Sequence, residues 1–159
     1  MSAGSELERL IRKAAKSLRE YQVATLWKIP NDLRVTASGI ATFADEQPAD
    51  FIGHTRTGRV IMVEAKQHKK ERLPLFSKSG VTPYQWTSLL ECHKAGGIAL
   101  IVWQCGDEVA TFDMDIAIAL SKDRRSIPFR KIQKRFCHPA TDDTAHLTMF
   151  EPYLKVIPS

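Results

Sequence analysis

Apolar residues near the amino terminus recur at the spacing of one face of a helix. They fall at i, i+3, i+4, i+7, i+8 and i+11, and they are Leu7, Leu10, Ile11, Ala14, Ala15 and Leu18. This single stripe predicts an amphipathic helix of about four turns. Ser5 and Glu8 have the spacing of a capping box at the start of that helix. Glu8 therefore has two interpretations, a capping residue or a carboxylate at the edge of the stripe that points toward a site.

The segments that follow have the residue types of strands. Residues 21–29 are rich in β-forming residues and predict a first strand, which ends at Pro30. From residue 33 to residue 48 the pattern weakens into small and β-branched residues. A stretch like this in a compact domain is typical of a functional loop or a projecting hairpin, and Arg34 is its only arginine.

Two further segments predict a pair of neighbouring strands. Residues 48–53 form the first strand, and residues 60–66, with the sequence Val-Ile-Met-Val-Glu-Ala-Lys, form the second. Residues 54–58 have the composition of a connecting turn. We expect this turn to bring Asp50 opposite Glu64.

The second half of the chain predicts a helix followed by a buried strand. Thr82 as the N-cap and a proline at the first helical position open a helix over residues 83–94. Gln85 either completes a capping box with Thr82 or contacts a metal-bound water or a phosphate. The unbroken apolar run at residues 98–103 predicts a central strand covered on both faces, and residues 109–112 predict an edge strand beside it.

Composition fits one cytoplasmic domain. The 159 residues, 43% of them hydrophobic, suffice for a single core over residues 1–159. The chain has no apolar run of membrane-spanning length and no signal-peptide pattern, so we expect a cytoplasmic protein without a membrane partner. Three cysteines without C-x-x-C spacing and five histidines without ligand spacing indicate neither a disulfide framework nor a zinc site.

Basic residues exceed acidic residues in this chain. Lys and Arg number 23 against 18 Asp and Glu, a net charge of +5 that is compatible with a polyanionic partner. The densest basic segment is residues 122–135, within a carboxyl-terminal segment of residues 122–159. It is either the solvated face of an amphipathic helix or a contact for a nucleic-acid backbone. The candidate DNA-binding residues along the chain are Arg34, Lys69, Lys70, Arg72, Lys78, Arg124, Arg125, Arg130 and Lys131.

Asp50, Glu64 and Lys66 have the residue types of a metal-dependent phosphodiesterase site. A period of two places Glu64 and Lys66 on one face at the end of an apolar strand. Carboxylates hold hard cations such as Mg²⁺ and leave positions for water and phosphate, and the carbonyl of Ala65 is a third candidate ligand. The Lys66 ammonium suits orientation of the attacking water or stabilisation of the transition state. A plain salt bridge between Lys66 and a neighbouring carboxylate is the alternative.

A helix that bears a glutamate, an aspartate at a strand start and E-x-K at the end of the next strand is similar to the arrangement of the PD-(D/E)xK nuclease superfamily. The similarity extends to Holliday-junction resolvases of the RecU and Hjc types and rests on short motifs in the same order between about residues 4 and 135. These motifs are Gly4-Ser5-x-x-Glu8-Arg9, Pro30, Phe43, Gln47-Pro48, Val63-Glu-Ala-Lys66, Leu73-Pro-Leu-Phe76, Tyr84-Gln85 and Ser126-Ile-Pro-Phe129.

The resemblance implies a fold and a partner. The fold is α/β with a restriction-endonuclease-like core, in which a central mixed β-sheet is flanked by helices. About residues 33–48 would form a projecting stalk that enters the centre of a four-way DNA junction, with Arg34 as the arginine used on the junction. The resemblance also implies a homodimer, because two symmetric nicks need two active sites.

The same resemblance implies the residues of the catalytic centre, which are Glu8, Asp50, Glu64, Lys66 and Gln85. Asp50, Glu64 and the Ala65 carbonyl would hold Mg²⁺, for which Mn²⁺ can substitute, and Glu8 is a further candidate ligand. The first hypothesis is therefore metal-dependent resolution of Holliday junctions by paired phosphodiester hydrolysis, in DNA recombination and repair.

Two alternatives to a junction resolvase stay open. One is another PD-(D/E)xK nuclease, of the restriction or flap-repair type, which acts on duplex or flap DNA. The other is a non-catalytic DNA-binding dimer that keeps the fold. The intact set Asp50, Glu64 and Lys66 argues against the second, because an inactive descendant would be free to lose any of the three.

Overall fold

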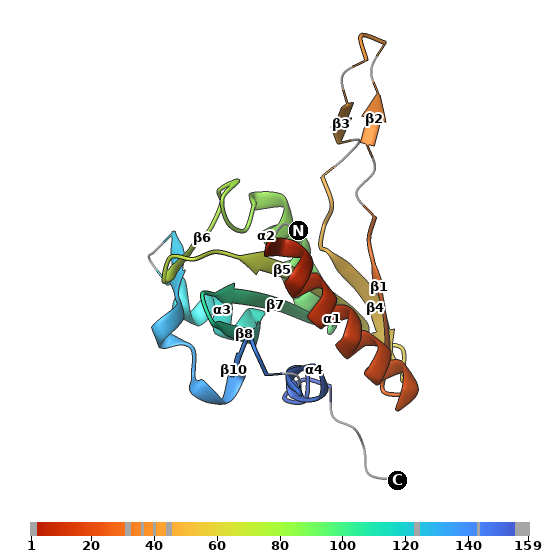
Figure 1. The fold of residues 1–159 in the computed structure, drawn as a ribbon, viewed down its shortest axis with the longest axis vertical. Helices are drawn as coiled ribbons and strands as arrows, with labels where there is room; N and C mark the ends of the chain where they lie inside the picture. The colour runs from red at the N-terminus through yellow and green to blue at the C-terminus, as the bar shows by residue number, and fades with distance from the viewer. Residues whose placement is uncertain are drawn as a thin grey trace.

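The computed structural model describes residues 3–30, 33–35, 37–39, 41–43, 46–122, 125–142 and 144–154. Within these residues, six strands form one sheet in the order β1-β4-β5-β7-β8-β10, and helices lie on both of its faces (Figure 1). The α-helices are α1 (Ala3–Glu20), α2 (Pro83–Lys94), α3 (Met114–Leu120) and α4 (Ala145–Thr148). The predicted α/β architecture is confirmed.

The described strands are more numerous than the sequence predicts. They are β1 (Ala24–Lys28), β2 (Leu33–Val35), β3 (Ala41–Phe43), β4 (Phe51–Thr55), β5 (Val60–Gln67), β6 (Arg72–Pro74), β7 (Ile98–Cys105), β8 (Glu108–Asp113), β9 (Ser126–Pro128) and β10 (Cys137–Pro139). The central pair, β5 and β7, is parallel, while the other neighbours in the sheet are antiparallel, so the sheet is mixed as predicted.

Helix α1 covers the β1, β4 and β5 part of one face, with α4 beside it. Its apolar stripe buries Ile11 and Ala14 completely, against strand residues such as Phe51 and Val63. The predicted capping box is wrong, because α1 begins at Ala3 and Ser5 therefore lies inside the helix.

Helices α2 and α3 cover the opposite face, over β5, β7 and β8. Trp103 and Phe112 are fully buried in this layer. Helix α2 has the bounds that the sequence predicts, with Thr82 as its N-cap. The side chain of Asp113 caps α3 by accepting a 3.0 Å hydrogen bond from the N–H of Ile116. The crossover through α2 allows β5 and β7 to run parallel.

Two predicted features of the strands differ from the structure, and the outermost strand beside β8 was not predicted. Strand β4 continues to Thr55, so residues 54 and 55 belong to the strand and not to the turn. Strand β8 is not an edge strand, because β10 pairs with its outer side. The short strand β10 contains a proline, and because proline is disfavoured in strands, β-propensity does not predict a strand there.

Two small sheets lie outside the main one. Strands β2 and β3 pair as a hairpin that extends away from the six-stranded sheet (Figure 1). Strands β6 and β9 pair with each other, although they are far apart in the sequence. In the described part of the basic segment, residues 125–135, strand β9 is followed by two 3₁₀ turns, Phe129–Lys131 and Lys134–Phe136, so the alternative of an amphipathic helix is wrong there.

No helix among the described residues is long and apolar enough to cross a membrane. All three cysteines are free thiols, in agreement with the expectation of no disulfide framework. The cytoplasmic location stays a prediction.

Candidate active site

Strands β4 and β5 bring the predicted acidic residues together at one end of the sheet. Phe51 pairs with Val63, so Asp50, one residue before β4, stands opposite Glu64 in the same register. The N–H of Asp50 continues the ladder by donating a 3.1 Å hydrogen bond to the carbonyl of Val63. Its own carbonyl accepts a 2.7 Å bond from the N–H of Ile29, at the end of β1. The backbone of Asp50 is therefore fixed from both sides.

The carboxylate of Asp50 is held by two further groups. Its Oδ2 accepts a 2.8 Å hydrogen bond from the N–H of Ala65. Its Oδ1 lies 3.4 Å from the ammonium of Lys28. The N–H and the carbonyl of one strand residue point to the same side of the strand. The Ala65 carbonyl therefore projects toward the side of β5 on which Asp50 lies.

Glu64 is the most deeply buried charged residue of the described chain, with 1% of its surface exposed. Its Oε1 lies 3.0 Å from the ammonium of Lys66, and its Oε2 is buried without a hydrogen-bond partner. Burial, followed by the charge of Asp50, raises the pKa of Glu64 to about 8, although Lys66 acts in the opposite direction. A carboxylate in this position needs more positive charge than Lys66 supplies.

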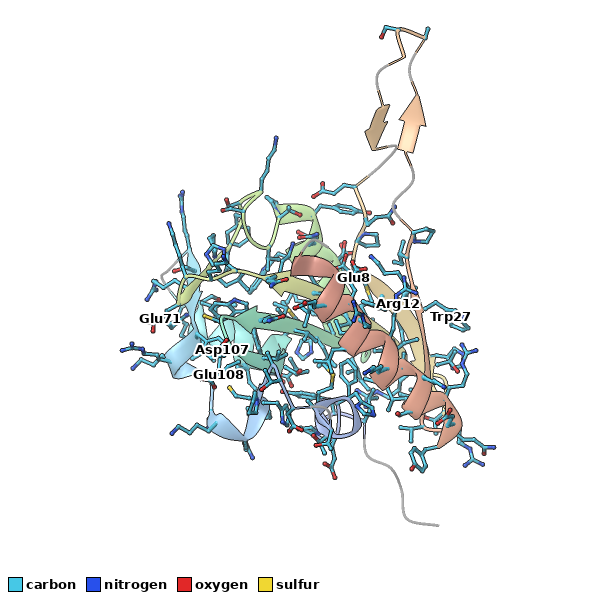
Figure 2. All side chains as sticks on the ribbon, viewed as in Figure 1. Glu8, Arg12, Trp27, Glu71, Asp107 and Glu108 are labelled. Carbon is cyan, nitrogen blue, oxygen red and sulfur yellow. The ribbon has the colours of Figure 1, made fainter. Side chains whose placement is uncertain are left out.

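Glu8 reaches the same end of the sheet from α1. Its Oε1 lies 3.5 Å from the ammonium of Lys28, which bridges it to Asp50. Figure 2 shows Glu8 near the amino-terminal end of α1. Of the two interpretations of Glu8, the structure favours a carboxylate directed toward the site.

Lys28 is a site residue that the sequence reading missed. Only 12% of its side chain is exposed, and its ammonium lies 5.6 Å from the ring centre of Phe51. A signal for it exists in the sequence, because a period of two from the buried Ala24 and Leu26 places the last residue of β1 on the face that α1 covers. A lysine on a buried face indicates a partner of opposite charge.

Gln85 occupies the capping position that the sequence allowed. The hydroxyl of Thr82 accepts a 3.2 Å hydrogen bond from the Gln85 N–H, and Oε1 of Gln85 accepts a 3.0 Å bond from the Thr82 N–H. The Thr82 hydroxyl itself donates a 2.6 Å hydrogen bond to Glu46. The catalytic role of Gln85 stays a prediction.

The donor set fits a divalent cation. Asp50 and Glu64 supply carboxylate oxygens and Ala65 supplies a carbonyl, which are the ligand types that Mg²⁺ and Mn²⁺ prefer. The unpartnered Oε2 of Glu64 is the observation that decides the fit, since a buried carboxylate oxygen without a partner is costly. Across the described residues, no three His, Cys, Asp or Glu side chains form a metal-binding group, so the candidate protein ligands are two carboxylates and a backbone carbonyl.

The pairing of β6 with β9 joins two basic segments that are far apart in the sequence. Arg72 stands opposite Pro128, and its Nε donates a 3.0 Å hydrogen bond to the Ser126 hydroxyl. Arg130 donates hydrogen bonds of 3.0 and 2.8 Å to Oε1 of Glu71. The exposed basic residues of these segments and of the loop after β6 are Lys69, Lys70, Arg72, Lys78, Arg125, Arg130 and Lys131. Strand β6 lies at the same end of the sheet as the β2–β3 hairpin (Figure 1).

The side chains of two predicted DNA-binding residues lie outside the described part of the structure. Arg124 lies outside the described residues. The backbone of Arg34 lies in β2, opposite Thr42 of β3, and its side chain is outside the described part.

Comparison with known proteins identifies the family. The family model described as Recombination protein U matches residues 2–157. The chain belongs to the RecU family. RecU proteins are Holliday-junction resolvases, and the chain is accordingly a nuclease that resolves Holliday junctions in DNA recombination. Resolvases of this kind generally use divalent metal ions. The predicted family and function are confirmed.

This RecU protein was also compared with solved structures and with curated proteins. Among solved structures it is similar to Hjc of Archaeoglobus fulgidus, a Holliday junction resolvase from an archaeal hyperthermophile, with 13% sequence identity and a TM-score of 0.43. That match covers 69% of this chain and 78% of the Hjc chain. A search of curated proteins finds no match.

Proposed function

We propose that the RecU chain cuts four-way DNA junctions in pairs of symmetric nicks at the centre built from Asp50, Glu64 and Lys66, with Mg²⁺ as cofactor and Mn²⁺ as a substitute. The observation that carries the proposal is the buried Oε2 of Glu64 beside Asp50. Two close carboxylates, one of them buried and without a partner for one oxygen, are suited to a cation and poorly suited to a purely structural role.

Asp50, Glu64 and the carbonyl of Ala65 would hold the cation. When bound, it would neutralise charge on the phosphoryl oxygens and lower the pKa of a bound water. The Ala65 N–H fixes the orientation of the Asp50 carboxylate. Lys66, 3.0 Å from Glu64, orients the attacking water or offsets charge in the transition state. Glu8 and Lys28 form the polar wall on the side of α1.

Substrate binding is assigned to two surfaces. The basic residues of β6, β9 and the neighbouring loops contact DNA phosphates, and the single nuclease domain over residues 1–159 presents them together. The segment of about residues 33–48 enters the open centre of the junction as a stalk. Arg124 and Arg34 belong to these two surfaces by their sequence positions. A homodimer acts on the junction in the cytoplasm, because paired nicks require two active sites.

A cleavage assay tests the proposal. A mobile four-way junction, a flap and a linear duplex are incubated with the wild type, with Asp50→Asn and with Glu64→Gln, in Mg²⁺ and in Mn²⁺. We expect paired nicks in the junction, little cleavage of the other substrates, and loss of cleavage with retained junction binding in both variants.

The control variant is Glu108→Gln, which removes an exposed carboxylate at a distance from Glu8, as Figure 2 shows. It should cleave as the wild type does. Full cleavage by Asp50→Asn or Glu64→Gln would contradict the site. Junction binding without any nick in either metal would contradict the catalytic proposal.

A further inference from the structure

Phe76, in the loop between β6 and α2, combines an exposed ring with an unusual backbone. Half of its surface, 50%, is exposed. Its φ of +57° lies in the left-handed region, which bulky side chains rarely adopt. Among the described residues other than glycine, Gln22 alone shares a positive φ, also +57°. Gln22 follows the end of α1, where this conformation is common, whereas Phe76 follows no helix.

The loop holds Phe76 between two buried anchors. Leu75 is 3% exposed and Val81 is fully buried, and the N–H of Val81 donates a 2.9 Å hydrogen bond to the carbonyl of Pro74. A side chain at Gly80 would collide with the same carbonyl, so the loop closes tightly only with glycine at this position. The exposed ring is therefore presented from a firmly held backbone. Residues kept in a rare backbone conformation by their surroundings cluster at functional sites.

The ring of Phe76 is oriented by Trp86 of α2. The two ring centres lie 5.7 Å apart with an angle of 65° between the planes, an edge-type contact. Trp86 itself packs against the buried cluster under α2 and α3. This contact fixes the direction of the Phe76 ring and leaves half of the residue open to a ligand.

The loop stands on the face of the sheet to which the catalytic side chains point. Leu75 belongs to the same buried cluster as Met62 of β5. Because side chains alternate along a strand, Glu64 and Lys66 project to the face on which Met62 lies. Figure 1 shows the loop at the end of the sheet from which the β2–β3 hairpin extends. Phe76 thus shares both the face and the end of the sheet with the candidate site.

The charges around Phe76 favour DNA over a protein as its partner. Between Glu71 and Glu91 the chain contains no acidic residue. Arg72 precedes Phe76 and Lys78 follows it, and both are exposed. An exposed aromatic ring between two cations is the combination that binds unpaired nucleic-acid strands, because the ring stacks on a base while the cations contact phosphates.

We propose that Phe76 stacks on a base at the branch point of the junction, with Arg72 and Lys78 on the flanking phosphates. The inference rests on the proposed function, since the base belongs to the substrate named there. A base at the branch loses a stacking neighbour when the arms of the junction separate, and an aromatic face can replace that neighbour. Phe76 would therefore help to distinguish a branch from continuous duplex.

Three variants test the role of the ring. Phe76→Gly removes the ring and accepts the positive φ without strain. Phe76→Leu keeps an apolar side chain beside Trp86 but has no aromatic face. The matched control is Gln22→Gly, which makes the same backbone change at the same φ, at the end of α1. Circular dichroism and urea denaturation of the full chains verify folding.

The substrates are an intact four-way junction, junctions that lack one symmetric pair of bases at the branch, and a junction that lacks bases in the middle of an arm. Gel-shift affinities are measured in EDTA, so that the DNA stays uncut. We expect one pair of branch abasic sites to weaken binding by the wild type about ten-fold, in the range of base–aromatic stacking. Abasic sites in the arm should have no such effect.

Phe76→Gly and Phe76→Leu should bind the intact junction about ten-fold more weakly than the wild type, and the branch abasic sites should weaken them no further. Gln22→Gly should follow the wild type. A wild type indifferent to every branch base would overturn the inference. So would a variant of Phe76 that loses as much affinity as the wild type when the base is removed. Unchanged affinity in both folded variants would overturn it as well, and would leave the ring for contact with a protein. If Phe76→Gly does not fold, Phe76→Leu alone decides.

Junction cleavage separates this inference from the proposed function. A wild type whose affinity depends on Phe76 and on a branch base, but which makes no nick in Mg²⁺ or Mn²⁺, would contradict the proposed function alone. A wild type that makes paired nicks without any dependence on a branch base would contradict the role of Phe76 alone.

Discussion

The backbone N–H of Ala65 donates a 2.8 Å hydrogen bond to Oδ2 of Asp50, so the strand that carries Glu64 also orients the second carboxylate of the site. This contact couples the position of the Asp50 side chain to the register of β4 and β5. The carboxylates are thus placed by the backbone of two paired strands, which are more rigid supports than loops.

The first prediction concerns the length of the side chain at position 50. Asp50→Glu keeps the charge but adds one methylene, which moves the carboxylate away from the Ala65 N–H. We expect a loss of about 100-fold in the single-turnover cleavage rate, because a displacement of about 1 Å at a catalytic group has effects of this size. Rapid-quench measurement with a four-way junction gives the rate. A rate within a few-fold of the wild type would show that the Ala65 contact does not position Asp50.

The second prediction concerns pH and the buried Glu64. In the unfolded chain its pKa is close to the ordinary 4.5, and in the folded protein without metal it is about 8. Between these values the folded state binds the extra proton, so the free energy of unfolding falls as pH rises. One such proton corresponds to a slope of about 1.4 kcal/mol per pH unit. Urea titrations in EDTA from pH 5 to pH 8 measure it.

Glu64→Gln has no titrating group at this position. Its free energy of unfolding should therefore lack the part of the pH dependence that comes from Glu64. The stability difference between Glu64→Gln and the wild type should therefore grow with pH, in favour of the variant. Glu108→Gln, in which an exposed carboxylate is replaced, should follow the wild type. Parallel curves for the wild type and Glu64→Gln would contradict the raised pKa.

Much of the fold and of the site could be predicted from residue pattern, and the failures have physical causes. The apolar residues of α1 recur at helical spacing, and the residues before Glu64 form an apolar run. The helix, the strand and the Asp50–Glu64 pairing were therefore predictable. Strands β6, β9 and β10 each have three residues, too few for a period to register. Their pairing depends on distant partners, as in the contact of Arg72 with Ser126. Lys28 was not predicted because its role depends on contacts with Glu8 of α1 and with Asp50, both of which are distant in the sequence.

The third prediction concerns Lys28, which lies between two carboxylates. Lys28→Met leaves Glu8 and Asp50 without the ammonium that bridges them at 3.5 and 3.4 Å. We expect a loss of about 1 kcal/mol in the free energy of unfolding in EDTA, at the upper end for ion pairs that are partly exposed. Lys16→Met removes the exposed pair with Glu20 and should cost less than about 0.5 kcal/mol. Equal losses in both variants would contradict a bridging role for Lys28.

The fourth prediction concerns Arg34 in the β2–β3 hairpin. Arg34→Ala should reduce the cleavage rate of the junction more than it reduces junction affinity. Affinity is shared among many phosphate contacts, so the loss of one arginine changes it little, whereas a contact at the junction centre sets the position of the strands. Gel-shift affinities and single-turnover rates are measured on the same junction. An unchanged cleavage rate would contradict the role of the hairpin arginine.

The fifth prediction separates the two roles of Gln85. Thr82 and Gln85 form one capping box of two hydrogen bonds at the start of α2, and Thr82→Ala and Gln85→Ala each remove the side-chain acceptor of one of them. Each should cost about 1 kcal/mol of stability, the usual effect of losing an N-cap. A purely structural Gln85 then predicts equal cleavage by the two variants.

A Gln85 that also contacts the substrate or a bound water predicts a different result. Gln85→Ala should then lose cleavage at least ten-fold beyond Thr82→Ala, at the same stability. We expect this excess loss, because Gln85 lies in the first turn of a helix that is anchored to Glu46, close in sequence to Asp50. Urea denaturation and junction cleavage by both variants measure the two quantities. Equal cleavage at equal stability would leave Gln85 as a capping residue and remove it from the catalytic centre.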